Sequence, residues 1–271
     1  MKKALKINLL VLLPAGFIMF SKAAMVNYSI AYLFDMGMDS WIATFIAFGI
    51  RIVSLFGSNI LRKYPLSVKE STAVGGLFSI LTSFGFFSIY FIHNVYVVFI
   101  ASIFYGIGVV SQIINQGNLM TAINNIIENK RDFSNVFAGA DAMKILINMI
   151  FSALLALIVS GYNVGMALLV IGILHLAMGF WMIIKSGGFK ELLSHHSSIN
   201  KKKKKSDSEF IRRLSRLSFW IMLSGVWSGS VPTVEILGRF NLDSSWVALL
   251  TLVTTVGFSF SFLVILSSNF M

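Results

Sequence analysis

The stretch Val164–Ile184, which reads VGMALLVIGILHLAMGFWMII, decides the fold class of this protein. Its one ionisable side chain is His175, and the stretch matches the roughly 20 mostly apolar residues that a helix needs to cross a hydrocarbon core of about 30 Å. Unpaired backbone groups are costly in lipid, so a long continuous run of this kind predicts a transmembrane helix and excludes barrel strands.

Runs of the same kind recur along the whole chain. Of the 271 residues, 56% are hydrophobic and only 12% are charged, whereas soluble proteins carry about 25% charged residues. The chain has no cysteine, which excludes a disulfide scaffold and cysteine-ligated metals. The composition therefore predicts an all-α, polytopic helical membrane protein. Eight spans are expected, at 8–32, 42–61, 72–92, 95–119, 134–160, 164–184, 218–238 and 246–267.

A basic segment divides these spans into six and two. Ten of the 22 Lys and Arg residues lie between Lys185 and Arg216. We expect a six-helix bundle over 1–184, a cytoplasmic loop over 185–217, and the first two helices of a second bundle over 218–271. Because the positive charge is clustered in this loop, it predicts contact with anionic lipid rather than binding of nucleic acid, despite a net charge of +11.

The distribution of cations also predicts the orientation. Short loops that stay in the cytoplasm are rich in Lys and Arg. A cytoplasmic N-terminus places 18 of the 22 cations inside and only Arg239 outside, as expected for a multi-pass protein of the cell membrane. The alternative for the N-terminus is a cleaved signal peptide with a small-residue site at Ser21-Lys22-Ala23. One long span fits better, because apolar sequence resumes after Lys22 and continues to Leu33.

Two segments of the chain are similar to each other. Asp39-Ser40-Trp41 follows span 1, and Asp243-Ser244-Ser245-Trp246 follows span 7. Each places an Asp, a Ser and a Trp at the mouth of the next helix, which indicates an internal repeat.

Six spans, a basic loop and a second set that opens like the first resemble the layout of the major facilitator superfamily. That family's loop after helix 2 reads Gly-x-x-x-Asp-Arg-x-Gly, and the place is taken here by Gly57-Ser58-Asn59-Ile60-Leu61-Arg62-Lys63-Tyr64. Gly57 and Arg62 match the pattern, whereas Leu61 and Tyr64 depart from it. In helix 4 the chain keeps Gly106-Ile107-Gly108 but has Ser102 where the family often has Arg.

The resemblance implies two six-helix halves, transport of a small solute by alternating access, and a gating role for Gly57 and Arg62. It also implies four further helices after Met271. The sequence is therefore expected to be a fragment of a longer carrier or a shortened form whose function need not be transport.

Polar side chains at bilayer depth mark the candidate substrate site, because each is costly unless it faces protein or water. They form stripes at helical spacing on spans 2, 4 and 5, and their three cations exceed one carboxylate, which favours an anionic solute. The alternative is a set of ion pairs that only fix packing. Asp141 could also carry a coupling proton. The candidate residues are Lys22, Arg51, Gln112, Asn115, Asp141, Lys144 and Asn148.

Three further features complete the prediction. Glu235 is an outer-gate contact or lies wetted at the membrane interface. His175 is expected to be a packed or snorkelling histidine on a peripheral helix, and a proton relay is the alternative. Gly225 and Gly229 form a weak Gly-x-x-x-Gly packing motif in span 7. No span carries a nucleophile-and-base or metal-binding motif, so we expect no enzyme and no cofactor. The predicted function is secondary active transport; the alternative is a non-transporting membrane protein or partner subunit.

Overall fold

The structure is a computed structural model, and it describes residues 17, 21, 24–39, 41, 45, 48–50, 52–53, 67–126, 130–187 and 233–268. Within these ranges the chain forms helices joined by short turns and contains no strand, so the predicted all-α class is confirmed. Among the described residues, three helices are long and apolar enough to cross a membrane, which is consistent with a membrane protein. They lie at Lys69–Ile92, Lys144–Gly161 and Val164–Ser186.

Each long described helix overlaps a predicted span. The helices α4 (Val68–Ile92), α5 (Val95–Ile126), α6 (Lys130–Gly161), α7 (Val164–Ser186) and α10 (Ser244–Ser268) correspond to spans 3, 4, 5, 6 and 8. However, α4 and α6 begin four residues earlier than predicted and α5 ends seven residues later. The outer end of span 1 is the π-helix η1 (Ala24–Tyr28) followed by α2 (Ser29–Asp35), and that of span 7 contains the π-helix η3 (Glu235–Arg239). Most of span 2 and the basic loop lie outside the described residues.

Local sequence explains several of these boundaries. Ser67 starts α4 with a capping box, in which its hydroxyl accepts from the Glu70 amide at 3.2 Å and its own amide donates to the Glu70 carboxylate at 2.8 Å. His93 ends the same helix in the left-handed conformation, with φ of 53°. Asn163 caps α7 by accepting a hydrogen bond from the Met166 amide at 2.8 Å.

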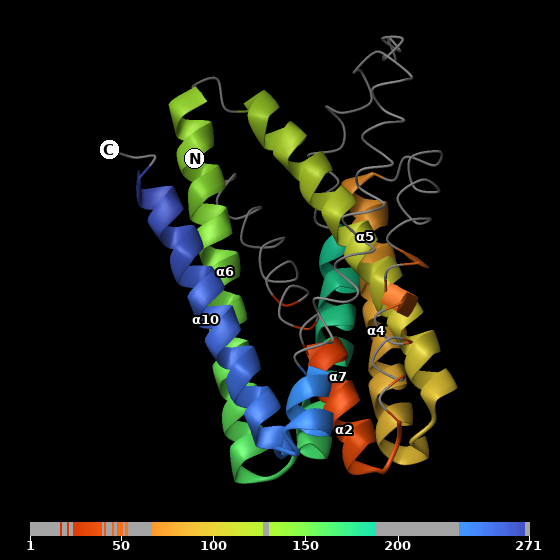
Figure 1. The fold of residues 1–271 in the computed structure, drawn as a ribbon. Coiled ribbons are helices and arrows are strands. Elements are labelled where there is room, and N and C mark those ends of the chain that lie inside the picture. Colours follow the sequence, from red (N-terminus) through yellow and green to blue (C-terminus); the bar gives the residue numbers. More distant parts are fainter. Residues whose placement is uncertain are drawn as a thin grey trace, which may run out of the picture.

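The helices pack in two groups (Figure 1). In one group α4 lies between α5 and α7, and α2 packs against α7; in the other α6 lies along α10. The short reversals at 36–39, 93–94, 162–163 and 240–243 all lie at the same, lower end of the molecule in this view. The helices α4, α5, α6 and α7 therefore run in alternating directions.

Small residues allow α7 to approach α4 closely. Gly76 and Gly179 face each other so tightly that a Cβ built on Gly179 would lie 2.7 Å from the Gly76 carbonyl oxygen. Two more glycines of α7, at intervals of seven residues, are also covered by α4: a Cβ on Gly172 would meet the Phe87 ring at 2.6 Å, and one on Gly165 would meet Tyr90 at 3.0 Å. Close packing of backbones through small residues is typical of helices within membranes.

Large apolar side chains lie on the outside of this packed unit as well as in its core. Leu77, Phe84 and Phe91, seven residues apart on α4, are exposed, while Ser79 and Ser83 of the same helix are buried. Large apolar side chains thus cover the outside, and small hydroxylated ones lie between the helices beside the apolar core, which is consistent with an apolar surrounding.

The two mouth segments that are similar in sequence also turn in the same way. Gly37 (φ 80°) and Asn241 (φ 54°) adopt left-handed backbone conformations, each two residues before the aspartate of its motif. The amide of the next residue then donates back to a helix carbonyl, that of Leu33 or of Ile236, at 3.0 Å in both cases. The local repeat predicted from sequence therefore has a matching backbone turn.

Candidate membrane-embedded site

Lys144 is the predicted site residue that the structure describes most fully. Its side chain is only 8% exposed, and Ser152, two turns later on α6, is buried with it. Asn148 lies between them on the same stripe and is half-buried. The opposite face of α6 presents exposed leucine and isoleucine side chains at 146, 150, 154 and 157. The predicted polar stripe of span 5 is therefore the inward face of α6 over these residues.

The other members of the predicted site cannot be placed in the same way. Lys22, Arg51, Gly57 and Arg62 lie outside the described residues. Gln112 and Asn115 lie on α5 and Asp141 on α6, but their side chains are not among those described. Whether these groups converge on one pocket therefore stays a prediction.

A polar contact that could not be identified from the sequence joins η1 to α10 and to the segment that begins at Thr233. Asn27, in η1, donates through Nδ2 to the Thr251 hydroxyl of α10 at 2.9 Å, and its Oδ1 accepts from the Thr233 hydroxyl at 3.0 Å. Thr233 and Thr251 are buried. We call these three residues the Asn27 hub. The only signal in the sequence was the presence of uncharged polar groups inside three predicted spans.

The η1 segment that carries Asn27 is a π-helix, as is η3, which follows Thr233 by two residues. Single-turn π segments are uncommon and occur frequently at functional positions, because they re-aim side chains relative to an α-helix. The hub residues on spans 1 and 7 thus both lie in or next to a π-helical turn.

Two carboxylates, those of Asp35 and Asp243, lie near each other beside the turns at 36–39 and 240–243. Partial burial raises the pKa of Asp35, the nearby Asp243 charge raises it further, and a hydrogen bond from the Ser244 side chain opposes both. The pKa of Asp243 is instead lowered, chiefly by the hydroxyl of Ser245. Among the described residues no group of three or more potential metal ligands occurs.

Glu235 lies on η3 near this end of the molecule. Its carboxylate pairs with Arg239 one turn later at 3.5 Å, and the two side chains are 41% and 76% exposed. This placement fits the interpretation of Glu235 as a wetted interfacial residue, and its gating role stays a prediction.

His175 is much more deeply enclosed than a lipid-facing histidine would be. It is 2% exposed, and its ring packs against Phe17 at a centroid distance of 4.7 Å and against Phe86 at 5.6 Å. The Ser79 hydroxyl lies 3.0 Å from Nδ1 and 2.9 Å from the His175 carbonyl oxygen. The prediction of a packed histidine is therefore correct, but its ring lies at the junction of span 1 with α4 and α7.

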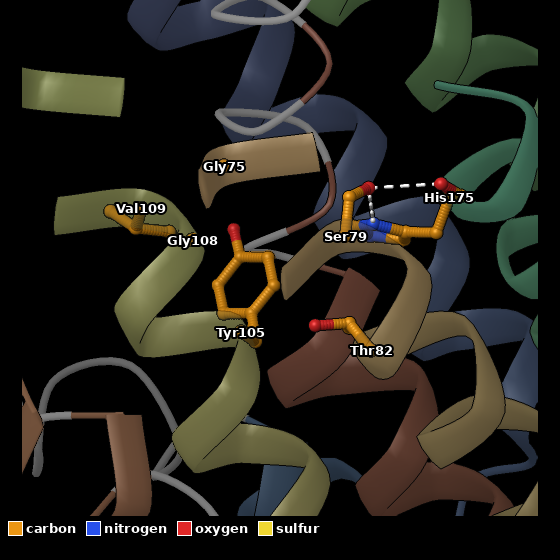
Figure 2. A pocket seen from close by; sticks show the side chains of 7 residues that line it. All are labelled: Gly75, Ser79, Thr82, Tyr105, Gly108, Val109 and His175. Carbon is orange, nitrogen blue, oxygen red and sulfur yellow. Dashed lines mark hydrogen bonds between the residues drawn. The ribbon is translucent and has the colours of Figure 1, made fainter. Parts of the chain in front are cut away.

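A small cavity opens beside this histidine (Figure 2). Its walls come from α4, α5 and α7, and its volume of about 10 Å³ is close to the space that one water molecule requires. Ser102 does not line this cavity, and its hydroxyl donates to the Phe99 carbonyl of its own helix at 2.7 Å. The lining residues are Gly75, Ser79, Thr82, Tyr105, Gly108, Val109 and His175.

Comparison with known protein families and with curated proteins finds no match for this chain.

Proposed function

We propose that this protein is a polytopic membrane carrier of a small anionic solute, with eight spans in a six-plus-two arrangement and a layout like that of the major facilitator superfamily. The observation that carries the proposal is the burial of Lys144 in α6, at 8% exposure. A cation at bilayer depth is costly, and such residues mark substrate or ion pathways by default.

The charge balance of the proposed site favours an anion over a cation as the solute. The stripe of Lys144 continues to half-buried Asn148 and buried Ser152, whose side chains can offer hydrogen bonds to a bound solute. An anion gains most from a buried positive group in a medium of low dielectric constant. The sequence adds Lys22 and Arg51 to the same proposed site, against the one carboxylate of Asp141.

The Asn27 hub supports alternating access. It joins span 1 to spans 7 and 8 through neutral hydrogen bonds of 2.9 and 3.0 Å. Such bonds are worth about 0.6 kcal/mol each on average within membranes, so a contact of this kind can break and re-form at moderate cost.

The test is uptake into proteoliposomes of a labelled panel of phosphate, sulfate, pyruvate, succinate and glutamate, with Lys144→Ala, Lys144→Arg and Lys185→Ala compared with the unmodified protein. Lys185 is the matched control, because it lies exposed in the last turn of α7. We expect Lys144→Ala to abolish uptake of the transported anion, Lys144→Arg to keep part of it, and Lys185→Ala to leave it unchanged.

Two outcomes would overturn the proposal. Equal effects of Lys144→Ala and Lys185→Ala would contradict a site at Lys144. Absence of uptake and of counterflow for every anion of the panel would instead favour the non-transporting membrane protein or partner subunit.

A further inference from the structure

We infer that the cavity between α4, α5 and α7 is a binding site for a single water molecule, which donates a hydrogen bond to Nε2 of His175. This site is independent of the solute transported, since none of its lining residues belongs to the predicted substrate site.

The first step is the tautomer of the histidine. A serine hydroxyl has one proton to donate, and a carbonyl oxygen can only accept. Ser79 contacts both the carbonyl oxygen of His175, at 2.9 Å, and its ring Nδ1, at 3.0 Å. Both contacts are hydrogen bonds only if Ser79 donates to the carbonyl and accepts from a protonated Nδ1. In the neutral imidazole, Nε2 is then the bare nitrogen, with a lone pair that calls for a donor.

The second step is that no described residue supplies this donor. Nε2 is buried and has no hydrogen-bond partner within the described part of the chain. An unsatisfied buried acceptor costs about 1–3 kcal/mol, so a polar group beside a cavity strongly favours occupation of that cavity by water.

The third step is that the cavity offers a second acceptor to the same water. Thr82 also lines it, and its hydroxyl proton is already donated to the Phe78 carbonyl at 2.7 Å. The lone pairs of Thr82 Oγ1 are therefore left to accept. Figure 2 shows Thr82, His175 and Tyr105 around the same space, with both bonds of Ser79 drawn. A water donating to Nε2 and to Thr82 meets the two to four partners that buried waters have.

The cavity is also the right size for water and too small for a solute. Its volume of about 10 Å³ corresponds to roughly one water-sized sphere. A methyl group added at Gly108, on the cavity wall, would meet only the Phe78 Cβ, at 3.6 Å. Gly108→Ala can therefore occupy the space without forcing the helices apart.

The experiment is nuclear magnetic resonance of ¹⁵N-histidine-labelled protein in lipid nanodiscs, with magnetisation transferred from water to the imidazole rings. The chain has 4 histidines, and the signal missing from His175→Phe assigns the ring of interest. We expect His175 to be protonated at Nδ1 and bare at Nε2, and to receive magnetisation from water. Gly108→Ala should remove that transfer and keep the tautomer, whereas Gly257→Ala, on α10, should change neither.

Three results would overturn the inference: an Nε2-protonated ring, no transfer from water in the unmodified protein, or undiminished transfer in Gly108→Ala. If Gly108→Ala does not fold, Thr82→Val replaces it, because it keeps the shape of the side chain and removes the second acceptor. We expect Thr82→Val to weaken the transfer, and unchanged transfer there would equally contradict the site.

Discussion

The contact between Gly76 and Gly179 gives the sharpest prediction for stability. In Gly179→Ala the new Cβ would lie 2.6 Å from Ile80 Cγ1 and 2.7 Å from the Gly76 carbonyl oxygen. Real Cβ atoms essentially never approach other atoms within 3.0 Å, so α4 and α7 must move apart by several tenths of an ångström. Overpacking of this kind costs about 1–3 kcal/mol, and the better helix propensity of alanine returns roughly 1 kcal/mol.

We therefore expect Gly179→Ala to lower the free energy of unfolding by up to about 2 kcal/mol, and by about 1–3 kcal/mol relative to a Gly→Ala change that meets no neighbour. Gly257→Ala is the matched control, because a Cβ there meets no atom of the described residues within 4 Å; it should be neutral or slightly stabilising. The measurement is equilibrium unfolding by SDS in mixed micelles, followed by far-ultraviolet circular dichroism.

A double substitution tests the cause of the loss. A Cβ on Gly76 would lie 2.8 Å from the Gly179 carbonyl oxygen, so either substitution alone already separates the same two helices. We expect the loss in Gly76→Ala/Gly179→Ala to be smaller than the sum of the single losses, since neighbouring sites couple. Strict additivity, or a Gly179→Ala protein as stable as Gly257→Ala, would refute the close helix crossing.

Three further predictions use the same unfolding assay or its thermal equivalent. Asn27→Leu should lower the free energy of unfolding by about 1–2 kcal/mol, because it breaks two hydrogen bonds. Asn27→Leu/Thr233→Val should lower it by less than the sum of the two single losses, because it removes both partners of one bond. Additive losses would contradict the hub. Asn163→Ala should cost about 1 kcal/mol through loss of the α7 cap, and Asn163→Asp should not. The pKa of Asp243 is lowered in the folded state, so its stabilising effect is complete above its unfolded pKa of about 3.9 and is lost as the pH falls through the folded value. The unmodified protein should therefore lose more thermal stability between about pH 5 and pH 3 than Asp243→Asn, which keeps a capping side chain but does not titrate, and parallel pH profiles would contradict this.

Helix periods and boundaries could be predicted from the sequence because each depends on a continuous local pattern. The predicted span 164–184 and the observed Val164–Ser186 differ by two residues at one end, and the polar stripe through Lys144 and Ser152 is buried as expected. Long apolar runs and spacings of three or four residues are properties of one helix, and they need no knowledge of its neighbours.

What the sequence analysis missed depends on which helices are neighbours. Gly165, Gly172 and Gly179 recur every seven residues in the stretch that decides the fold, and His175 lies between the last two. That spacing places all four on one face of α7, so an inward histidine was predictable. The partner helix was not, because nothing in α7 itself specifies that Ser79 of α4 would meet the ring. The weak motif at Gly225 and Gly229 was noted instead, and it lies outside the described residues.

The two kinds of contact in this molecule suit different roles in a carrier of the proposed kind. Alternating access requires contacts within one half to persist while contacts between the halves break. The glycine crossing of α4 and α7 leaves no space to slide, because a shift in register would drive the Gly76 and Gly179 carbonyls into larger side chains such as Ile80 and Ile183. The Asn27 hub instead joins span 1 to spans 7 and 8, which the proposal assigns to different halves, through two neutral hydrogen bonds, which water can replace when they open. If α4, α5 and α7 move as one body, cross-linking α4 to α7 should leave uptake intact, whereas cross-linking span 1 to α10 beside Asn27 and Thr251 should stop it. The reverse result would refute this division of the molecule.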